Sequence, residues 1–145
     1  MKLTSREEDY LETIYRLSQT IDAVGISDVA HERQVTLPTV KSAVKRLKEN
    51  GLVSQRHYGK IVLNASGRKQ AEDIYRVHSA LRIFLNEILQ LPPELSEHEA
   101  CRMEHGMSKK TINRLVDFTE LVRNCPVKDS GCLSNYKKSK KRKTT

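Results

Sequence analysis

Side chains that commonly bind metal ions are concentrated in residues 99–105. If this stretch is helical, Cys101, Glu104 and His105 occupy positions i, i+3 and i+4, which places all three on one face. A thiolate, a carboxylate and an imidazole that converge on one point are suitable ligands for a divalent transition metal ion. The alternative is a solvated charged face with a buried cysteine, so further ligands must come from elsewhere in the chain.

Further candidate ligands lie in two other predicted helices. Asp9 and Glu12 are three residues apart in a helix expected over residues 5–19, and His78 lies in a helix expected over residues 67–89. By themselves, such carboxylates are usually surface charges, and a lone helical histidine is usually packed or exposed. These residues become candidates only in combination with the cluster at residues 99–105.

The charge of the chain suggests a polyanionic partner. A chain of 145 residues holds one or two small domains. The formal net charge is +8, but residues 137–143 carry six positive charges, which leaves about +2 for the remainder. The excess of basic residues favours a partner such as nucleic acid, although the charged end could instead be a disordered solubilising tail.

Several other classes of protein are disfavoured. No apolar run is long enough to span a bilayer, and the first residues lack the apolar core of a signal peptide, so we expect a cytoplasmic protein with no membrane partner. The three cysteines, Cys101, Cys125 and Cys132, are an odd number, which argues against a disulfide framework and favours metal binding or reactive thiols. With neither a nucleophile–base pair nor a glycine-rich phosphate loop, we expect no enzymatic activity.

The N-terminal half has the pattern of a winged helix-turn-helix. A short helix from Ile26, a turn, and a second helix over residues 39–50 follow one another, with Pro38 at the first position of the second helix. Two short strands, residues 52–56 and 61–63, then form a hairpin, or wing. This order favours a DNA-binding module over a generic helical domain.

The exposed positions of this module are expected to contact DNA. Residues that open the second helix are best placed to meet base edges: Thr36, Pro38, Thr39, Lys41 and Ser42. Residues farther along that helix and at the tip of the hairpin are expected to meet phosphates: Lys45, Arg46, Arg56, His57 and Lys60. Few of these side chains are bidentate readers of bases, so we expect modest base discrimination and a contribution from DNA shape.

The second half of the chain is predicted to be helical. The helix over residues 67–89 ends before Pro92. The next helix, which carries the metal cluster, is predicted to begin at a capping box of Ser96 with Glu99. A last helix covers residues 109–123. We therefore divide the chain into a winged helix-turn-helix DNA-binding domain (1–65), an all-helical domain (66–124) and a basic, disordered tail (125–145).

Three passages resemble one protein family. Residues 8–15 resemble its opening helix, residues 38–53 its recognition helix and the start of its wing, and residues 99–108 its metal motif. The family is that of the metal-dependent repressors typified by the diphtheria toxin repressor, the mycobacterial iron-dependent regulator and the manganese transport regulator. The resemblance covers about residues 4–124. It implies a mostly α fold, in which the winged helix-turn-helix precedes a helical dimerisation and metal-binding domain, and a homodimer that represses transcription at a double-stranded DNA operator.

The resemblance also implies a ligand set of mixed origin. The iron branch has a methionine where this chain has Asp9, and the manganese branch has a glutamate where it has Cys101. An ancillary site of the iron branch is not expected in its usual form, because Arg82 and Glu97 replace two of its ligands. The ligands implied by the resemblance are Asp9, Glu12, His78, Cys101, Glu104 and His105.

The chemistry of these ligands favours Fe²⁺ over Mn²⁺. Oxygen and imidazole ligands suit both ions, whereas a thiolate favours the softer one, and Zn²⁺ or Co²⁺ should also bind in vitro. Glu104 could bridge two ions in each subunit. Metal binding is expected to hold the first helix against the dimerisation core and so to set the spacing of the two winged helices. The alternative is a winged-helix regulator that senses redox state or a small ligand through its cysteines.

Overall fold

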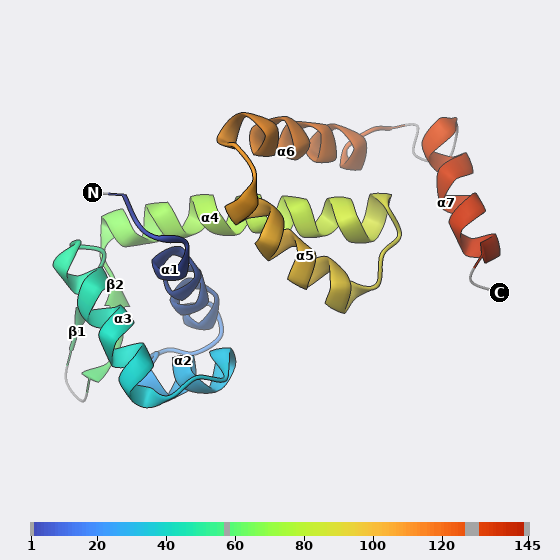
Figure 1. The fold of residues 1–145 in the computed structure, drawn as a ribbon. Coiled ribbons are helices and arrows are strands. Elements are labelled where there is room, and N and C mark those ends of the chain that lie inside the picture. The colour runs from blue at the N-terminus through green and yellow to red at the C-terminus, as the bar shows by residue number, and fades with distance from the viewer. Residues whose placement is uncertain (1, 57–58, 127–130, 144–145) are drawn as a thin grey trace. The chain divides into compact units, whose positions relative to one another are not determined.

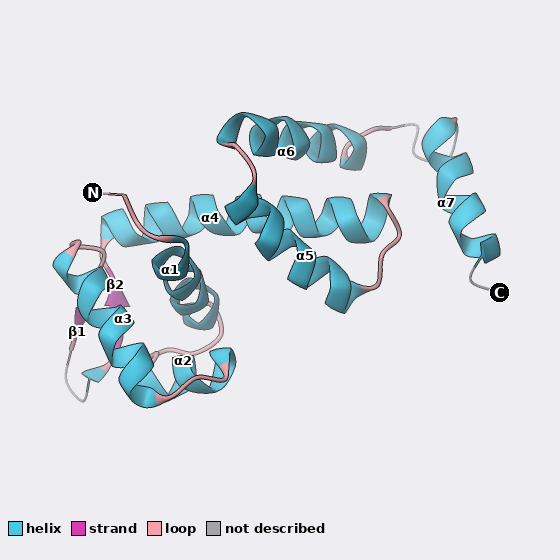
Figure 2. Cartoon of the chain, in the orientation of Figure 1, coloured by secondary structure: helices cyan, strands magenta, loops and turns pink. Residues whose placement is uncertain are grey.

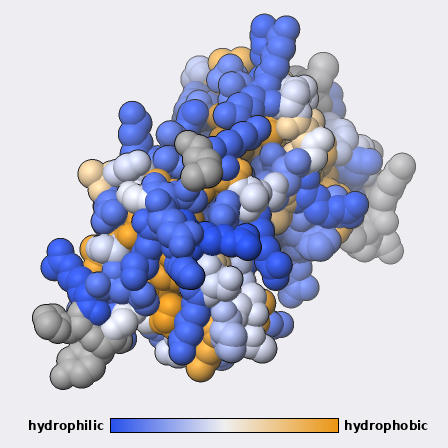
Figure 3. Space-filling view, turned by 60° about the vertical axis from the view of Figure 1, so that its left-hand side comes forward, coloured by the Kyte–Doolittle hydropathy of each residue, from blue (hydrophilic) through white to orange (hydrophobic). Residues whose placement is uncertain are grey.

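The computed structural model describes residues 2–56, 59–126 and 131–143, and these are mostly helical with one two-stranded sheet (Figure 1, Figure 2). The chain divides into two compact units, Met1–Tyr75 and Arg76–Thr145. Among the described residues, no helix is both long and apolar enough to cross a membrane. Hydrophilic residues predominate on the face drawn in Figure 3. The predicted mostly α fold is confirmed.

The first unit is a winged helix-turn-helix, as the sequence predicted. Helices α1 (Ser5–Ser18), α2 (Ile26–Arg33) and α3 (Leu37–Glu49) pack around one apolar core. Strands β1 (Val53–Gln55) and β2 (Ile61–Leu63) pair antiparallel and form the wing. The helices contribute apolar side chains that recur every three or four residues: Leu11, Ile14, Val29, Val40, Val44 and Leu47.

The spacing of Ser5 and Glu8 predicts a capping box at the start of α1, and the structure has this box one residue earlier. The cap is Thr4 and not Ser5, because the acidic residue three positions on is Glu7, whose carboxylate accepts a hydrogen bond from the Thr4 N–H at 2.7 Å. In return, Thr4 Oγ1 accepts from the Glu7 N–H at 3.3 Å. The bonds from the Thr4 backbone and side chain favour the charged carboxylate and lower the pKa of Glu7 below its usual 4.5.

The two helices of the helix-turn-helix begin at caps of different kinds. The sequence favours Ser27 as the cap of α2. The cap is instead Gly25, whose N–H donates a hydrogen bond to the Asp28 carboxylate at 2.7 Å. Gln34, with φ of 55°, ends α2 in the left-handed conformation. The sequence offers Thr36 or Leu37 as the cap of α3, and in the structure the cap is Thr36.

A close backbone contact joins the wing to helix α4 (Ala65–Ile83). A Cβ atom on Gly67 would overlap the carbonyl oxygen of Leu52, so this position accommodates only glycine. The same carbonyl accepts a hydrogen bond from the Asn64 N–H at 2.9 Å. The first turn of α4 is therefore fixed against the start of the hairpin.

The second unit contains the end of α4, a short helix η2 (Phe84–Ile88), and helices α5 (Pro93–Gly106), α6 (Lys109–Arg123) and α7 (Cys132–Lys143). Two small clusters of apolar side chains hold it together. Residues of α4 and η2 pack on α5 and α6 in these clusters, with the following side chains buried: Ala80, Leu81, Leu85, Ala100, Ile112 and Val116.

The single helix predicted over residues 67–89 is wrong in its second part. Helix α4 ends at Ile83, and η2 is a π-helical turn after which the Leu89 N–H donates to the Phe84 carbonyl at 3.0 Å. Gln90 then adopts a left-handed conformation with φ of 60°. The chain leaves the helix here because Pro92 soon follows and a proline cannot continue one.

Helix α5 begins three residues before the predicted cap. Pro93 occupies its first turn, where the missing N–H of proline costs nothing. Ser96 is instead a fully buried residue of the helix, and its hydroxyl donates to the Pro92 carbonyl at 2.9 Å. The capping box predicted from Ser96 and Glu99 is therefore wrong.

The sequence predicted a disordered tail from residue 125. The structure differs in that residues Cys132–Lys143 of this tail form a helix, α7. Its apolar residues explain the difference, because Tyr136 Oη donates to the Leu89 carbonyl at 3.4 Å and Leu133 lines a cavity beside α6. A carbonyl at the end of a helix has no partner within the helix, and the tyrosine supplies one for Leu89.

Candidate metal centre

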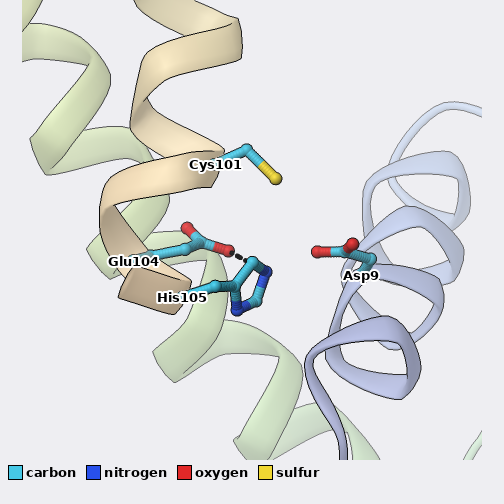
Figure 4. A group of neighbouring side chains, drawn as sticks. All are labelled: Asp9, Cys101, Glu104 and His105. Atoms are coloured by element: carbon cyan, nitrogen blue, oxygen red, sulfur yellow. Dashed lines mark ion pairs between the residues drawn. The ribbon is translucent and has the colours of Figure 1, made fainter. Parts of the chain in front are cut away.

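Helix α5 presents the predicted triad on one face. One ligand atom each of Cys101, Glu104 and His105 lies within 4.8 Å of the other two. Figure 4 shows these side chains projecting from α5, with an ion pair drawn between Glu104 and His105; it also draws Asp9 on α1. The helical spacing alone brings the triad together, as the sequence predicted.

His78 of α4 joins this face through two carboxylates of α5. Its Nδ1 lies 3.0 Å from Glu104 Oε2, and its Nε2 lies 2.8 Å from Glu97 Oε1. Only the protonated imidazolium donates from both nitrogens at once. His78 is 5% exposed, so these contacts fix the orientation of its ring within the second unit.

The second oxygen of Glu104 provides a test of whether these residues suit a cation. Glu104 Oε1 lies 3.3 Å from His105 Nε2, but it is buried and accepts no hydrogen bond from the described residues. A buried acceptor left without a donor costs about 1–3 kcal/mol. A divalent cation beside Cys101 and His105 would be ligated by this oxygen, so the residues present fit such an ion.

The first unit holds the other two predicted ligands, Asp9 and Glu12, on α1. Asp9 Oδ2 lies 3.5 Å from the Arg33 guanidinium, whereas Glu12 is only 7% exposed. Carboxylates on a helix are usually exposed to solvent, so the burial of Glu12 is unusual. Both residues stay candidate ligands from the sequence.

Glu97 is a member of the cluster that was not among the metal ligands predicted from the sequence. It accepts from His78, and its other oxygen lies 3.6 Å from the Arg82 guanidinium. Its spacing from Cys101 and Glu104, four and then three residues, places it on the same face of α5, which was a usable signal. Arg82 and Glu97, which stand in place of two ligands of the iron branch's ancillary site, therefore form an ion pair with each other.

The predicted DNA-binding residues lie mostly on the exposed side of α3. Those exposed on α3 and its cap are Thr36, Pro38, Lys41, Ser42, Lys45 and Arg46, and Thr39 is half-buried. Thr36 and Thr39 share a hydrogen bond of 2.8 Å between their hydroxyls. Four of these residues also line a groove with the start of α1: Pro38, Thr39, Ser42 and Arg46.

The tip of the wing carries the remaining candidates. Arg56 is exposed and Lys60 is half-buried, and the Arg56 N–H donates to the Lys60 carbonyl at 2.8 Å, which closes the hairpin. His57, the third residue expected at the tip, lies outside the residues that the structure describes.

Family models match both units. A model of the iron-dependent repressor N-terminal DNA-binding domain matches residues 2–61. A model of the iron-dependent repressor metal-binding and dimerisation domain matches residues 64–132. The two matches together span most of the chain, and both agree with the fold.

Individual relatives support the same assignment. An uncharacterised HTH-type transcriptional regulator of Methanocaldococcus jannaschii is 32% identical over 114 residues, 78% of this chain and 91% of that protein. The diphtheria toxin repressor of Corynebacterium glutamicum is 31% identical over 124 residues, 86% of this chain and 54% of that protein. The solved structure of the manganese regulator SloR is similar with a TM-score of 0.70 and 30% identity, covering 83% of this chain and 56% of that one. The chain therefore spans about half the length of the last two.

Proposed function

Since the chain belongs to the iron-dependent repressor family, we propose that it is a transcriptional repressor whose homodimer binds an operator in double-stranded DNA when a divalent metal ion is bound. The observation that carries this proposal is the thiolate, carboxylate and imidazole cluster of α5, which lies within the matched metal-binding domain. Relatives named as transcriptional regulators favour a regulator over an enzyme.

The proposed metal ligands are Cys101, Glu104 and His105 from α5, His78 from α4, and Asp9 and Glu12 from α1. The buried, unsatisfied Glu104 Oε1 supports the first three. The burial of Glu12 and its spacing from Asp9 support the α1 pair. The ion is Fe²⁺ in preference to Mn²⁺, because the thiolate of Cys101 favours the softer ion.

The proposed switch follows from the charges of these side chains. Asp9, Glu12 and Glu104 are acidic, and like charges that approach one another repel more strongly away from water. A bound divalent cation supplies the positive charge that offsets this repulsion. In that state α1 is held to the metal-binding unit, and the two winged helices of a dimer keep the separation that an operator requires.

The proposed coupling between the metal site and the DNA-binding surface is reciprocal. If the ligand side chains adopt their joined arrangement more readily in the DNA-bound state, then operator DNA must tighten metal binding by the same factor by which metal tightens DNA binding. Metal sensing is preferred to the redox alternative, since the matched C-terminal domain is described by its metal binding and dimerisation.

One experiment tests the proposal directly. Operator sequences are first selected from a random duplex library with metal-loaded protein, and apo protein is then titrated with Fe²⁺ under anaerobic conditions, Mn²⁺ or Zn²⁺ while operator binding is followed. We expect little specific binding without metal and activation at the lowest free concentration by Fe²⁺. Equal operator affinity in the presence of a chelator would refute metal control. Calorimetry of the same titrations counts one ion or two per subunit, and a count of two that falls to one in Glu104→Ala would support a bridge through Glu104.

A further inference from the structure

The C-terminal helix α7 is a strongly basic element beyond the matched family domain. The metal-binding domain model ends at residue 132, and α7 covers Cys132–Lys143. From residue 131 to residue 145 the sequence has six basic residues and no acidic one. Nothing in the family match therefore accounts for this concentration of charge.

One side of α7 is occupied by packing within the second unit. Tyr136 Oη donates to the Leu89 carbonyl at 3.4 Å, and Leu133 and Lys137 line a small cavity with Ile83 and Val122. Glu87 and Arg123 also line this cavity, and they pair with each other at 3.8 Å. The packed side uses the apolar residues of the helix.

The other side of α7 presents its charges to solvent. Lys138 and Lys141 are exposed and three residues apart, so they lie on one face. Lys140 is also exposed, but it lies four residues from Tyr136 on the packed side, with its ammonium 5.2 Å from the centre of the Tyr136 ring. Ordered lysines spaced along a helix match a phosphate backbone as point charges, and each contact formed releases a condensed counterion.

We infer that the exposed face of α7 is a second DNA-binding surface, which contacts the phosphate backbone without reading sequence. Charge complementarity selects a polyanion, and duplex DNA is the polyanion that this family binds through its N-terminal domain. The α7 surface adds affinity for any duplex, and it acts whether or not metal is bound.

The test compares two double variants of the full-length protein. Lys138→Gln with Lys141→Gln removes two charges from α7, and Lys109→Gln with Lys110→Gln removes two exposed charges from the start of α6 in the same unit. Binding to a short fluorescein-labelled duplex of mixed sequence is followed by anisotropy over a range of KCl concentrations with EDTA present. Circular dichroism checks that both variants stay folded.

We expect the α7 variant to bind the duplex more weakly, with a salt dependence reduced by about 0.9 in log–log slope per lost phosphate contact, or about 1.8 for each subunit that contacts the duplex. The α6 control should keep the wild-type slope. An unchanged slope in the α7 variant, or an equal reduction in both variants, would overturn the inference. So would loss of binding to phosphatidylglycerol vesicles with unchanged DNA binding, which would assign α7 to a membrane surface. Because EDTA is present throughout, failure of the metal mechanism would leave this result unaffected.

Discussion

His78 Nδ1 lies 3.0 Å from Glu104 Oε2, which links α4 to α5 through two predicted metal ligands. The opposite ring nitrogen is 2.8 Å from Glu97. Neither nitrogen of the ring therefore faces an empty space, and His78 can ligate an ion only by releasing one carboxylate. Because His78 would exchange a carboxylate of α5 for the metal ion, metal binding is coupled to the packing of α4 on α5.

Replacing Glu104 should remove the metal response. We expect Glu104→Ala to bind operator no better with Fe²⁺ than with chelator, because the central carboxylate ligand is lost while the apolar core of the second unit is kept. Operator affinity with and without metal measures the effect. The matched control is Glu94→Ala, an exposed acid at the start of the same helix. A wild-type metal response in Glu104→Ala would contradict the assigned ligand set.

Replacing Cys101 should change metal preference without abolishing metal binding. In Cys101→Glu an oxygen ligand replaces the thiolate, so activation by Mn²⁺ should improve relative to Fe²⁺ by about tenfold, or roughly 1.4 kcal/mol. The ratio of the two activation concentrations is the measurement. Cys125→Ser, just after the end of α6, should leave that ratio unchanged.

Substitutions on α3 should separate phosphate contacts from base contacts. Arg46→Ala should weaken binding to all duplexes and lower the salt slope by about 1, whereas Ser42→Ala should alter sequence preference with little change in slope. Salt titrations with operator and mixed-sequence DNA distinguish the two effects. Lys69→Ala, exposed on α4 of the same unit, serves as the charge control. If Arg46→Ala behaves like this control, Arg46 does not contact phosphate.

Adding a methyl group at Gly67 should destabilise the first unit. In Gly67→Ala the new Cβ overlaps the Leu52 carbonyl oxygen, and overpacking of this kind typically costs about 1–3 kcal/mol. Urea unfolding followed by circular dichroism measures the loss. Gly106→Ala is the control, since a Cβ there meets no atom within 4 Å. Equal stability of the two variants would mean that the backbone at the wing shifts freely.

The α1 capping box should be sensitive to acid. Bonds from Thr4 lower the pKa of Glu7, so the stabilisation that the charged Glu7 gives is complete above its usual pKa of 4.5 and is lost as the pH falls through the lowered value. Glu7→Gln should therefore lower the Tm at pH 7 and have a much smaller effect well below pH 4.5. A difference in Tm that stays constant across this range would exclude the carboxylate charge as its cause.

Local sequence patterns were sufficient to predict much of the secondary structure and part of the candidate metal site. The periodic apolar residues of α1 and α3 predict helices, the charged face after Pro38 predicts a recognition helix, and the spacing of Cys101, Glu104 and His105 predicts their common face. Each of these follows from the geometry of one helix. The cap at Thr4 was missed by one residue because neighbouring hydroxyl and acidic residues offer two registers for the same motif.

Tertiary packing decided where some helices begin and which residues of different helices meet. Ser96 has the pattern of a cap, yet its burial inside α5 depends on where Pro92 and Pro93 let the helix begin. The pairing of His78 with Glu97 and Glu104 joins residues 19 and 26 positions apart, and no periodicity relates them. The sequence by itself determined which side chains share a helix face, because that depends on residues three and four apart. Only the fold decided which faces meet, because that depends on how complete helices bury their apolar surfaces.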